Sequence, residues 1–532
     1  MRLPWQFGGR ASRAAGAPRA LSSLAALAAG AATVFGFAPF GLSFLPVVTV
    51  AFLFAMWQDA ATPRAAAASG FAFGLGLFLA GASWVYVALN TFGGMPWPLA
   101  AIGTAGFCAF LALYPALTGW LATRWTASHS LGRAGAAAAL WALSEWARSV
   151  VFTGFPWLSL GYASLPGGGA TWLSGYAPVG GVFLVSLAMA VLAAALALAS
   201  DALASAARAR IALAAFVGAI VVAGGAALAR IEWTHASGAP IAVSLIQGNV
   251  TQELKFDPEF RRSTFAIYTA LVRESRGRLV VLPESAFPMF ADEVPESVIV
   301  DLLDVVTPRD GDVLAGMFTL EAPLAPGGTP RYYNSVISIG GAKPQLYRKR
   351  HLVPFGETIP LEPVLGWFIR KILAIPISSQ ASGVSDPPAL DVAGTRVAVN
   401  ICYEDAFGAD IRTQAANAAV LVNVTNDAWY GRSIAALQHN QIASMRALET
   451  GRPLVRATNT GITSAIGYDG REVARLPWFT RGILEVEVTG REGVTPYVRV
   501  GDALAVSAAL VVALAAIIGA RASRGSTAAG TG

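Results

Sequence analysis

A cysteine, a glutamate and a lysine of this sequence are candidates for nucleophilic catalysis. Cys402 is one of two cysteines, and it stands in NICYED (400–405) at the end of the strand-like run TRVAVNI. A lone cysteine at the point where a strand gives way to a polar turn is typical of a nucleophile rather than of half a disulfide. Glu284 follows the apolar run LVVLP, and Lys349 lies in the basic run YRKRHLVPFGE.

The three residue types fit one reaction. A thiol needs a base to become a strong nucleophile, and Glu284 is a candidate to accept its proton. Attack on an acyl carbonyl creates an oxyanion, which Lys349 and the backbone N–H of Tyr403 are candidates to stabilise. Taken singly, Glu284 and Lys349 would each be interpreted as solvated surface residues. Both residues, like Cys402, stand at the end of a strand-like run, and this shared placement favours a catalytic site.

The order Glu, Lys, Cys resembles the triad of the nitrilase superfamily. The motifs HLVPFGE (351–357), NICYED, VTNDAWYG (424–431) and RATNTGIT (456–463), together with membrane spans, resemble the apolipoprotein N-acyltransferase family. The resemblance implies that Glu284 is the general base, Lys349 the oxyanion stabiliser and Cys402 the nucleophile. It also implies supporting roles for Glu357 and for Tyr403.

The resemblance assigns a supporting role to Glu404 as well, beside the nucleophile. We expect Glu357 to orient Lys349 and Glu404 to shape the site of the attacking amine. Phe256 stands in QGNVTQELKF where the family often has tryptophan. An aromatic ring is kept there, so packing against an acyl chain is predicted, but a role for an indole N–H is excluded.

Apolar residues near the triad are predicted to contact the substrate. Phe287 belongs to an apolar patch, with Met289 and Phe290, that comes just after Glu284, and Trp367 and Phe368 belong to the apolar stretch at 359–377. That stretch is too short to span a bilayer. It is predicted to rest on the outer leaflet beside the triad, and the alternative is a helix packed on its own domain.

Composition indicates a membrane protein. The 532 residues are 55% hydrophobic and 13% charged, whereas soluble domains carry about 25% charged residues. The net charge of +6 does not indicate a nucleic-acid partner, because the basic residues do not cluster with aromatic ones. The histidines are scattered, so we expect no metal. Cys108 lies within an apolar run and is predicted to be a small buried hydrophobe.

Apolar runs predict eight membrane spans, seven of them before residue 235. These lie at about 18–38, 42–57, 66–90, 98–121, 134–153, 174–199, 210–230 and 503–520. Lys and Arg occupy alternate loops, which places both termini in the cytoplasm and the large domain outside it. The first run has one alternative, a cleaved signal peptide. Glu145 and Arg148 lie within the fifth run and are predicted either to form a structural ion pair or to have a function.

These patterns divide the chain into three parts. Residues 1–234 form a transmembrane domain with seven spans, residues 235–495 a catalytic domain, and residues 496–532 a final span with a cytoplasmic tail. Alternating strand and helix patterns in the second part predict a layered α/β domain. The nitrilase resemblance makes this an αββα fold, attached to a polytopic α-helical membrane domain.

The expected function is transfer of an acyl chain from a membrane phospholipid to an apolipoprotein. The acceptor is the α-amine of the N-terminal diacylglyceryl-cysteine, and the intermediate is a thioester on Cys402. We expect a monomer in the bacterial inner membrane, with its catalytic domain on the periplasmic side, and no cofactor, because the donor ester already stores the energy. The alternative enzyme is a membrane-tethered amidase that hydrolyses a small C–N substrate, and the non-enzyme alternative is a transporter or scaffold.

Overall fold

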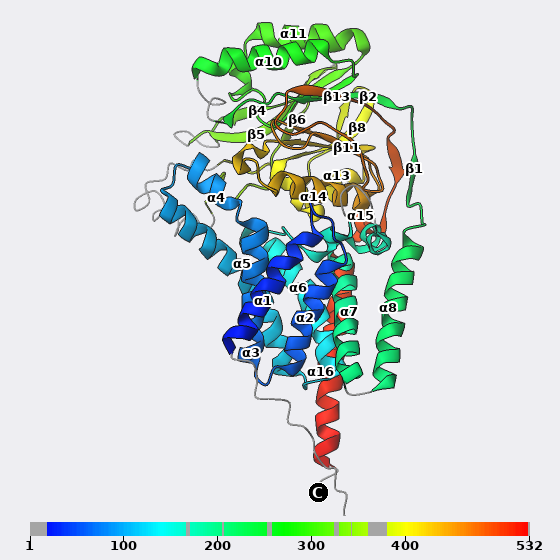
Figure 1. Cartoon of the computed structure of the whole chain (residues 1–532). Helices are drawn as coiled ribbons and strands as arrows, with labels where there is room; N and C mark the ends of the chain where they lie inside the picture. The colour runs from blue at the N-terminus through cyan, green and yellow to red at the C-terminus, as the bar shows by residue number, and fades with distance from the viewer. Residues whose placement is uncertain are drawn as a thin grey trace, which may run out of the picture.

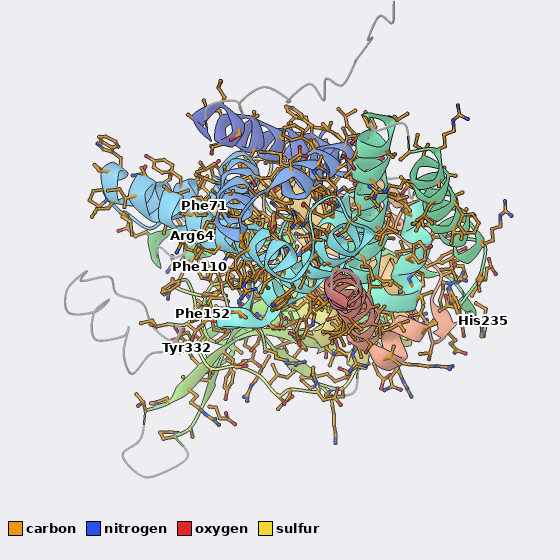
Figure 2. All side chains as sticks on the ribbon, turned by 90° about the horizontal axis from the view of Figure 1, so that it is seen from below. Arg64, Phe71, Phe110, Phe152, His235 and Tyr332 are labelled. Carbon is orange, nitrogen blue, oxygen red and sulfur yellow. The ribbon has the colours of Figure 1, made fainter. Side chains whose placement is uncertain are left out.

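The chain forms a bundle of helices that carries a layered α/β domain at one end (Figure 1). The computed structural model describes residues 19–165, 171–204, 207–252, 258–323, 329–341, 343–359 and 380–529. The C-terminal end of the last helix lies at the end of the bundle away from the α/β domain. Figure 2 looks along the helices from that end and labels Arg64 at the start of the third helix.

Helices lie at all eight positions that the apolar runs predict. They are α1 (Arg19–Thr33), α2 (Leu45–Asp59), α3 (Pro63–Ala82), α5 (Trp97–Trp125), α6 (Leu131–Val150), α7 (Ala177–Ala204), α8 (Arg208–Leu228) and α16 (Ala503–Ala529). Among the described residues five helices are long and apolar enough to cross a membrane, namely α3, α5, α7, α8 and α16, and α1 and α2 are shorter apolar helices. The count of eight spans stays a prediction.

Local sequence signals set the helix ends and their close packing. Thr62 caps α3 by accepting a hydrogen bond from the backbone N–H of Ala65. Buried Arg133, near the start of α6, donates to the backbone carbonyl of Trp57 at the C-terminal end of α2 (3.0 Å). A Cβ atom on Gly30 of α1 would clash with the carbonyl group of Phe73 in α3. Small residues therefore allow the close approach of these helices.

Two six-stranded sheets form the centre of the α/β domain. The first has the strand order β13 (Gly482–Val488), β2 (Ile241–Gln247), β3 (Leu279–Val281), β4 (Asp312–Glu321), β5 (Arg331–Gly340) and β6 (Leu346–Arg348). The second has the order β12 (Glu472–Arg475), β11 (Ser464–Ile466), β10 (Leu454–Thr458), β9 (Val420–Thr425), β8 (Thr395–Ile401) and β7 (Leu390–Val392). Parallel pairing joins β2 to β3 and β3 to β4 in the first sheet, and β8 to β9 and β9 to β10 in the second. Their carboxyl ends therefore point the same way within each sheet.

The domain has four layers, as the αββα prediction requires. Valine and isoleucine side chains from both sheets form the central core. Helices α10 (Arg261–Glu274) and α11 (Glu296–Val306) cover the outer face of the first sheet. Helices α13 (Gly408–Ala415) and α14 (Ala435–Thr450) cover the second sheet and lie between it and the membrane helices (Figure 1).

Helix α14 joins the catalytic domain to the bundle through two buried glutamines. Gln438 Oε1 accepts hydrogen bonds from the indole N–H groups of Trp84 (3.2 Å) and Trp157 (2.7 Å). Gln441 Oε1 accepts one from the backbone N–H of Ala38 (3.1 Å). Since the three donors come from separate connections of the bundle, the two parts of the chain are locked together at several points.

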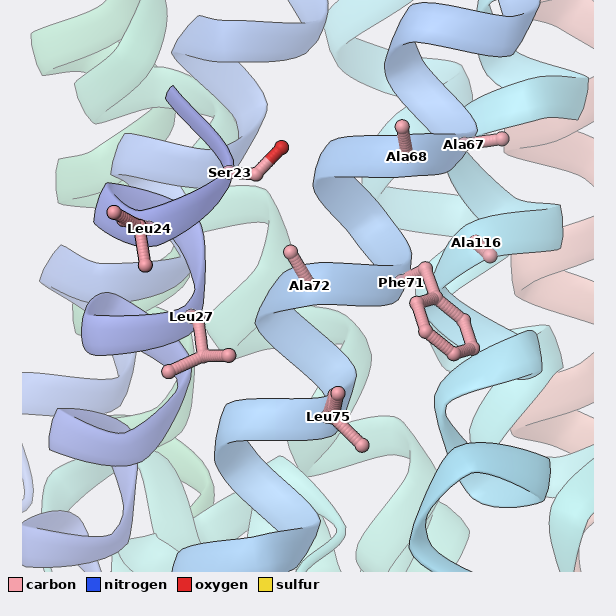
Figure 3. Close-up of a pocket in the computed structure, with 9 residues that line it drawn as sticks. All are labelled: Ser23, Leu24, Leu27, Ala67, Ala68, Phe71, Ala72, Leu75 and Ala116. Atoms are coloured by element: carbon pink, nitrogen blue, oxygen red, sulfur yellow. The ribbon is translucent and has the colours of Figure 1, made fainter. Parts of the chain in front are cut away.

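The bundle also has an apolar pocket on its flank. It has a volume of about 480 Å³ and lies between α1, α3 and α5. Figure 3 shows its wall, which is formed by Ser23, Leu24, Leu27, Ala67, Ala68, Phe71, Ala72, Leu75 and Ala116. Its lining includes no titratable side chain and none of the predicted catalytic residues, so the pocket is not the active site.

Candidate active site

Cys402 stands at the start of a tight turn at the carboxyl end of β8. Its backbone φ is +55°, a left-handed conformation that non-glycine residues rarely adopt. The turn continues as a short 3₁₀ helix, Cys402–Ala406. This geometry directs the chain sharply away from the sheet directly after the buried strand. The cysteine itself is 6% exposed.

Glu284 follows β3, and three groups hold its carboxylate. Oε1 accepts a hydrogen bond from Asn334 Nδ2 (2.8 Å) and lies 3.4 Å from Lys349 Nζ. Oε2 accepts one from the backbone N–H of Asn426 (2.9 Å). Asn334 lies on β5 and Asn426 follows β9, so both sheets fix this carboxylate in one orientation.

Lys349 follows β6 and is fully buried between two carboxylates. Its Nζ lies 2.8 Å from Glu357 Oε1 and 3.4 Å from Glu284 Oε1. Burial would lower the pKa of Lys349, but Glu357 and Glu284 outweigh burial and raise it well above its ordinary value. The lysine is therefore a fixed cation. The expectation that Glu357 orients Lys349 has a direct contact to support it.

The charges of Glu284 and Lys349 act on the thiol of Cys402. Burial first, and then the negative charge of Glu284, raise the pKa of Cys402 well above its ordinary value, while Lys349 acts in the opposite direction. The resting side chain is therefore a thiol rather than a thiolate. A base must remove its proton as it attacks, and Glu284, whose charge acts on this thiol, is the candidate.

Glu404 is a brace for the loop that carries Lys349. Its Oε1 accepts hydrogen bonds from the backbone N–H groups of Arg350 (2.7 Å) and His351 (3.0 Å). Its Oε2 accepts one from the backbone N–H of Ile401 (2.7 Å) and one from the hydroxyl of Tyr347 (2.8 Å). The carboxylate is buried and its four partners are all protein groups, which supports a structural role for Glu404. Its expected role in shaping the site of the attacking amine stays a prediction.

Tyr403 links the nucleophile to the membrane helices. Its hydroxyl donates to the carbonyl oxygen of Gly154 (2.9 Å), and its ring stacks on that of Trp157 with 6.4 Å between centroids. Gly154 and Trp157 belong to the loop that follows α6. The residue beside the nucleophile thus contacts the helical part of the chain directly.

Glu145 and Arg148 hold this same loop in place. Glu145 Oε1 accepts hydrogen bonds from Trp141 Nε1 (2.8 Å) and from the backbone N–H of Leu160 (3.0 Å). Arg148 donates to the backbone carbonyl oxygens of Phe155 and Trp157. Both buried charges therefore position the segment on which Tyr403 rests.

The structure places the predicted substrate contacts differently. The prediction for Phe287 is not supported, because its ring is fully buried in the core under α10, against Phe265 (5.4 Å between centroids) and Tyr268 (6.2 Å). Burial in this core leaves it no surface for a substrate. Phe256, Trp367 and Phe368 lie outside the described residues, so their roles remain predictions.

Sequence reasoning missed several polar residues around the triad. Asn334 and Asn426 hold Glu284, and four buried charged residues surround the back of the Cys402 turn. The only signal in the sequence was the concentration of polar residues in NICYED, VTNDAWYG and RATNTGIT. Within the described ranges no group of three or more His, Cys, Asp or Glu side chains is placed to hold a metal ion.

Fold and site together define a carbon–nitrogen hydrolase domain attached to a membrane bundle. Residues 233–497 match the carbon–nitrogen hydrolase family, and residues 29–196 match the N-terminal domain of apolipoprotein N-acyltransferases. An apolipoprotein N-acyltransferase from Nitrosomonas europaea is 47% identical over 90% of this chain and 94% of its own length. Its counterparts from Methylococcus capsulatus and Ralstonia nicotianae are 42% and 41% identical, over 90% and 94% of this chain and 92% and 93% of their own lengths. The chain belongs to the apolipoprotein N-acyltransferase family.

Proposed function

We propose that this protein transfers an acyl chain from a membrane phospholipid to the α-amine of the N-terminal diacylglyceryl-cysteine of apolipoproteins. The observation that carries the proposal is the buried ion cluster, in which Lys349 lies between Glu284 and Glu357 and acts on the thiol of Cys402. Membership of the family supports the choice of donor and acceptor.

In the first half-reaction Cys402 attacks the ester carbonyl carbon of the donor. The thiol proton passes to Glu284 as the sulfur–carbon bond forms. Lys349 stabilises the negative charge on the carbonyl oxygen, because it is a preorganised cation in a dry site. The carbon–oxygen bond then breaks, and Glu284 returns the proton to the departing oxygen of the lysophospholipid. The product on the enzyme is a thioester.

In the second half-reaction the acceptor amine attacks the thioester carbonyl. Glu284 takes a proton from the nitrogen, the carbon–sulfur bond breaks, and Cys402 recovers its proton. Water would compete with the amine for the thioester. The three triad side chains are at most 9% exposed, and this burial favours transfer over the hydrolysis expected of an amidase.

We further propose an orientation in the inner membrane. Arg64 lies at the start of α3, Arg124 at the end of α5 and Arg208 at the start of α8. Figure 2 views the bundle from the end away from the α/β domain and labels Arg64 there. Basic residues favour the cytoplasmic side of a membrane. The catalytic domain is accordingly assigned to the periplasmic side, where the lipid-anchored amine of the acceptor is presented.

Intact-mass spectrometry of the purified protein tests the reaction. After incubation with phospholipid vesicles we expect a mass increase of one fatty acyl group that hydroxylamine removes and that the diacylglyceryl-peptide amine discharges. Cys402→Ser should show no hydroxylamine-labile increase, whereas Cys108→Ser should behave like the wild type, because Cys108 is buried in α5. Release of free fatty acid at the same rate with and without the amine would instead support the hydrolase.

A further inference from the structure

Four buried charged side chains form a closed cluster behind the Cys402 turn. We call Asp405, Asp427, His439 and Arg456 the charge cluster. His439 lies 2.7 Å from Asp405 through Nε2 and 2.7 Å from Asp427 through Nδ1. Arg456 lies 2.6 Å from Asp405 and 3.2 Å from Asp427. Each carboxylate thus bridges the same two cations.

The cluster is electrically balanced only if the histidine is protonated. Burial and Arg456 would lower the pKa of His439, but Asp405 and Asp427 outweigh them and raise it to about 9. A doubly protonated imidazole donates from both nitrogens, which matches its two carboxylate contacts. Two positive and two negative side chains then lie together, and each of them is at most 2% exposed. Removal of any one of them would leave an uncompensated buried charge.

The cluster contacts the nucleophile through its backbone. His439 Nε2 also lies 3.3 Å from the carbonyl oxygen of Cys402, and Asn423 Nδ2 donates to the same oxygen (3.4 Å). Asp405 belongs to the same short helix as Cys402. Arg456 donates to Asn423 Oδ1 (2.7 Å). His439 and Asn423 thus hold the carbonyl oxygen of Cys402 at the start of the turn, and Asp405 lies within the turn itself. The charge cluster therefore fixes the left-handed backbone conformation of Cys402.

We propose that His439 is a positioning residue for acyl transfer, which acts by holding the Cys402 turn in its strained conformation. It has no role in proton transfer, because both its nitrogens are engaged by carboxylates. The ring of Trp157, from the loop after α6, lies 5.3 Å from the imidazole between centroids. The membrane part of the chain therefore packs against the same residue that fixes the nucleophile.

The test compares His439→Gln with wild type, both in a Cys108→Ser background and counted per folded molecule. A positioning role predicts at least a fivefold slower thioester formation from phospholipid, with an unchanged KM for the lipid, and a slower alkylation of Cys402 by iodoacetamide. The proposal rests on the proposed function, but the alkylation rate does not need the lipid. Absence of any thioester in the wild type would count against the function alone.

His235→Gln is the matched control. This histidine is exposed at the edge of the molecule (Figure 2), and its variant should keep both rates. The stability that His439 contributes should be complete below pH 6.5 and should be lost as the pH rises through about 9, because its pKa is raised from 6.5 to about 9 in the folded protein. His439→Gln should lack this dependence of the unfolding temperature on pH.

If His439→Gln does not fold, a double variant can still test the proposal. His439→Gln with Asp427→Asn removes one cation and one anion and leaves the buried charge balanced. We expect the unfolding temperature to recover while thioester formation stays slow, because the contact to the Cys402 carbonyl is still altered. Recovery of the rate together with stability would overturn the proposal, as would wild-type rates in a folded single variant.

Discussion

Glu404→Gln tests whether the Glu404 carboxylate supports the loop that carries Lys349, a structural role that we call the Glu404 brace. Glu404→Gln keeps the shape of the side chain but replaces one oxygen by an NH2 group. In the protein both oxygens accept hydrogen bonds, two from Arg350 and His351 and two from Ile401 and Tyr347. The carboxamide must turn its NH2 group toward one of these pairs. The donors of that pair lose their acceptor.

The loss of stability in Glu404→Gln depends on which pair of hydrogen bonds is broken. The Tyr347 hydroxyl can rotate and become an acceptor, so the best orientation leaves the backbone N–H of Ile401 unpaired. A buried donor without an acceptor costs about 1–3 kcal/mol. For a domain of this size that corresponds to a fall of roughly 2–12 °C in unfolding temperature. Tyr347→Phe removes one hydrogen bond to the carboxylate, worth about 1.5–3 kcal/mol, but leaves no donor unpaired. Glu404→Gln removes the charge from all four hydrogen bonds and also leaves a donor unpaired, so it should cost more.

Thermal unfolding in detergent, followed by tryptophan fluorescence, measures these differences. The expected order of unfolding temperatures is Glu404→Gln lowest, then Tyr347→Phe, then wild type. Glu487→Gln is the control, because Glu487 is exposed on β13 in the same domain. The interpretation as a brace is refuted if Glu404→Gln unfolds at the wild-type temperature and only the attack of the acceptor amine is slowed. That result would return Glu404 to the amine site.

Three further predictions address the triad, the orientation and the apolar segment. Glu357→Gln should slow thioester formation about tenfold to a hundredfold, because Lys349 loses a charge-assisted hydrogen bond worth about 1.5–3 kcal/mol; an unchanged rate by mass spectrometry would contradict this. A cysteine introduced at exposed Asp310 should label from the periplasm in whole cells, and labelling only after lysis would reverse the orientation. Replacing Trp367 and Phe368 with serine should slow acylation by membrane phospholipid and spare alkylation of Cys402, and equal effects on both would mean that the segment only packs on its own domain.

The sequence allowed the positions of the helices and of the triad to be predicted for simple reasons. Apolar runs of about 20 residues identify helices without any knowledge of their neighbours. Glu284, Lys349 and Cys402 each follow a strand, and they stand in short motifs that resemble those of the nitrilase superfamily. Both signals are local, so they can be recognised in a single sequence.

The remaining features depend on partners that are distant in the chain. Phe287 stands three residues after Glu284, yet the chain turns so that its ring enters the core beneath α10. Glu404 looks like a free carboxylate beside a nucleophile, but its partner Tyr347 lies 57 residues earlier. His439 shows no pattern that would connect it with Asp405, 34 residues away. Periodicity and motif spacing carry no information about such pairings.

The glutamines of α14 have a consequence for the lipids that reach the enzyme. Because Gln438 and Gln441 bond to separate connections of the bundle, these bonds oppose a swing of the catalytic domain toward the bilayer, and we expect the thiol to stay at a constant height above the helices. Glycerol esters lie at the boundary between head groups and hydrocarbon whatever the length of their chains. The rate of acylation should therefore vary little with donor chain length in one host membrane. It should vary with the thickness of the host membrane, which changes the depth at which the bundle sits.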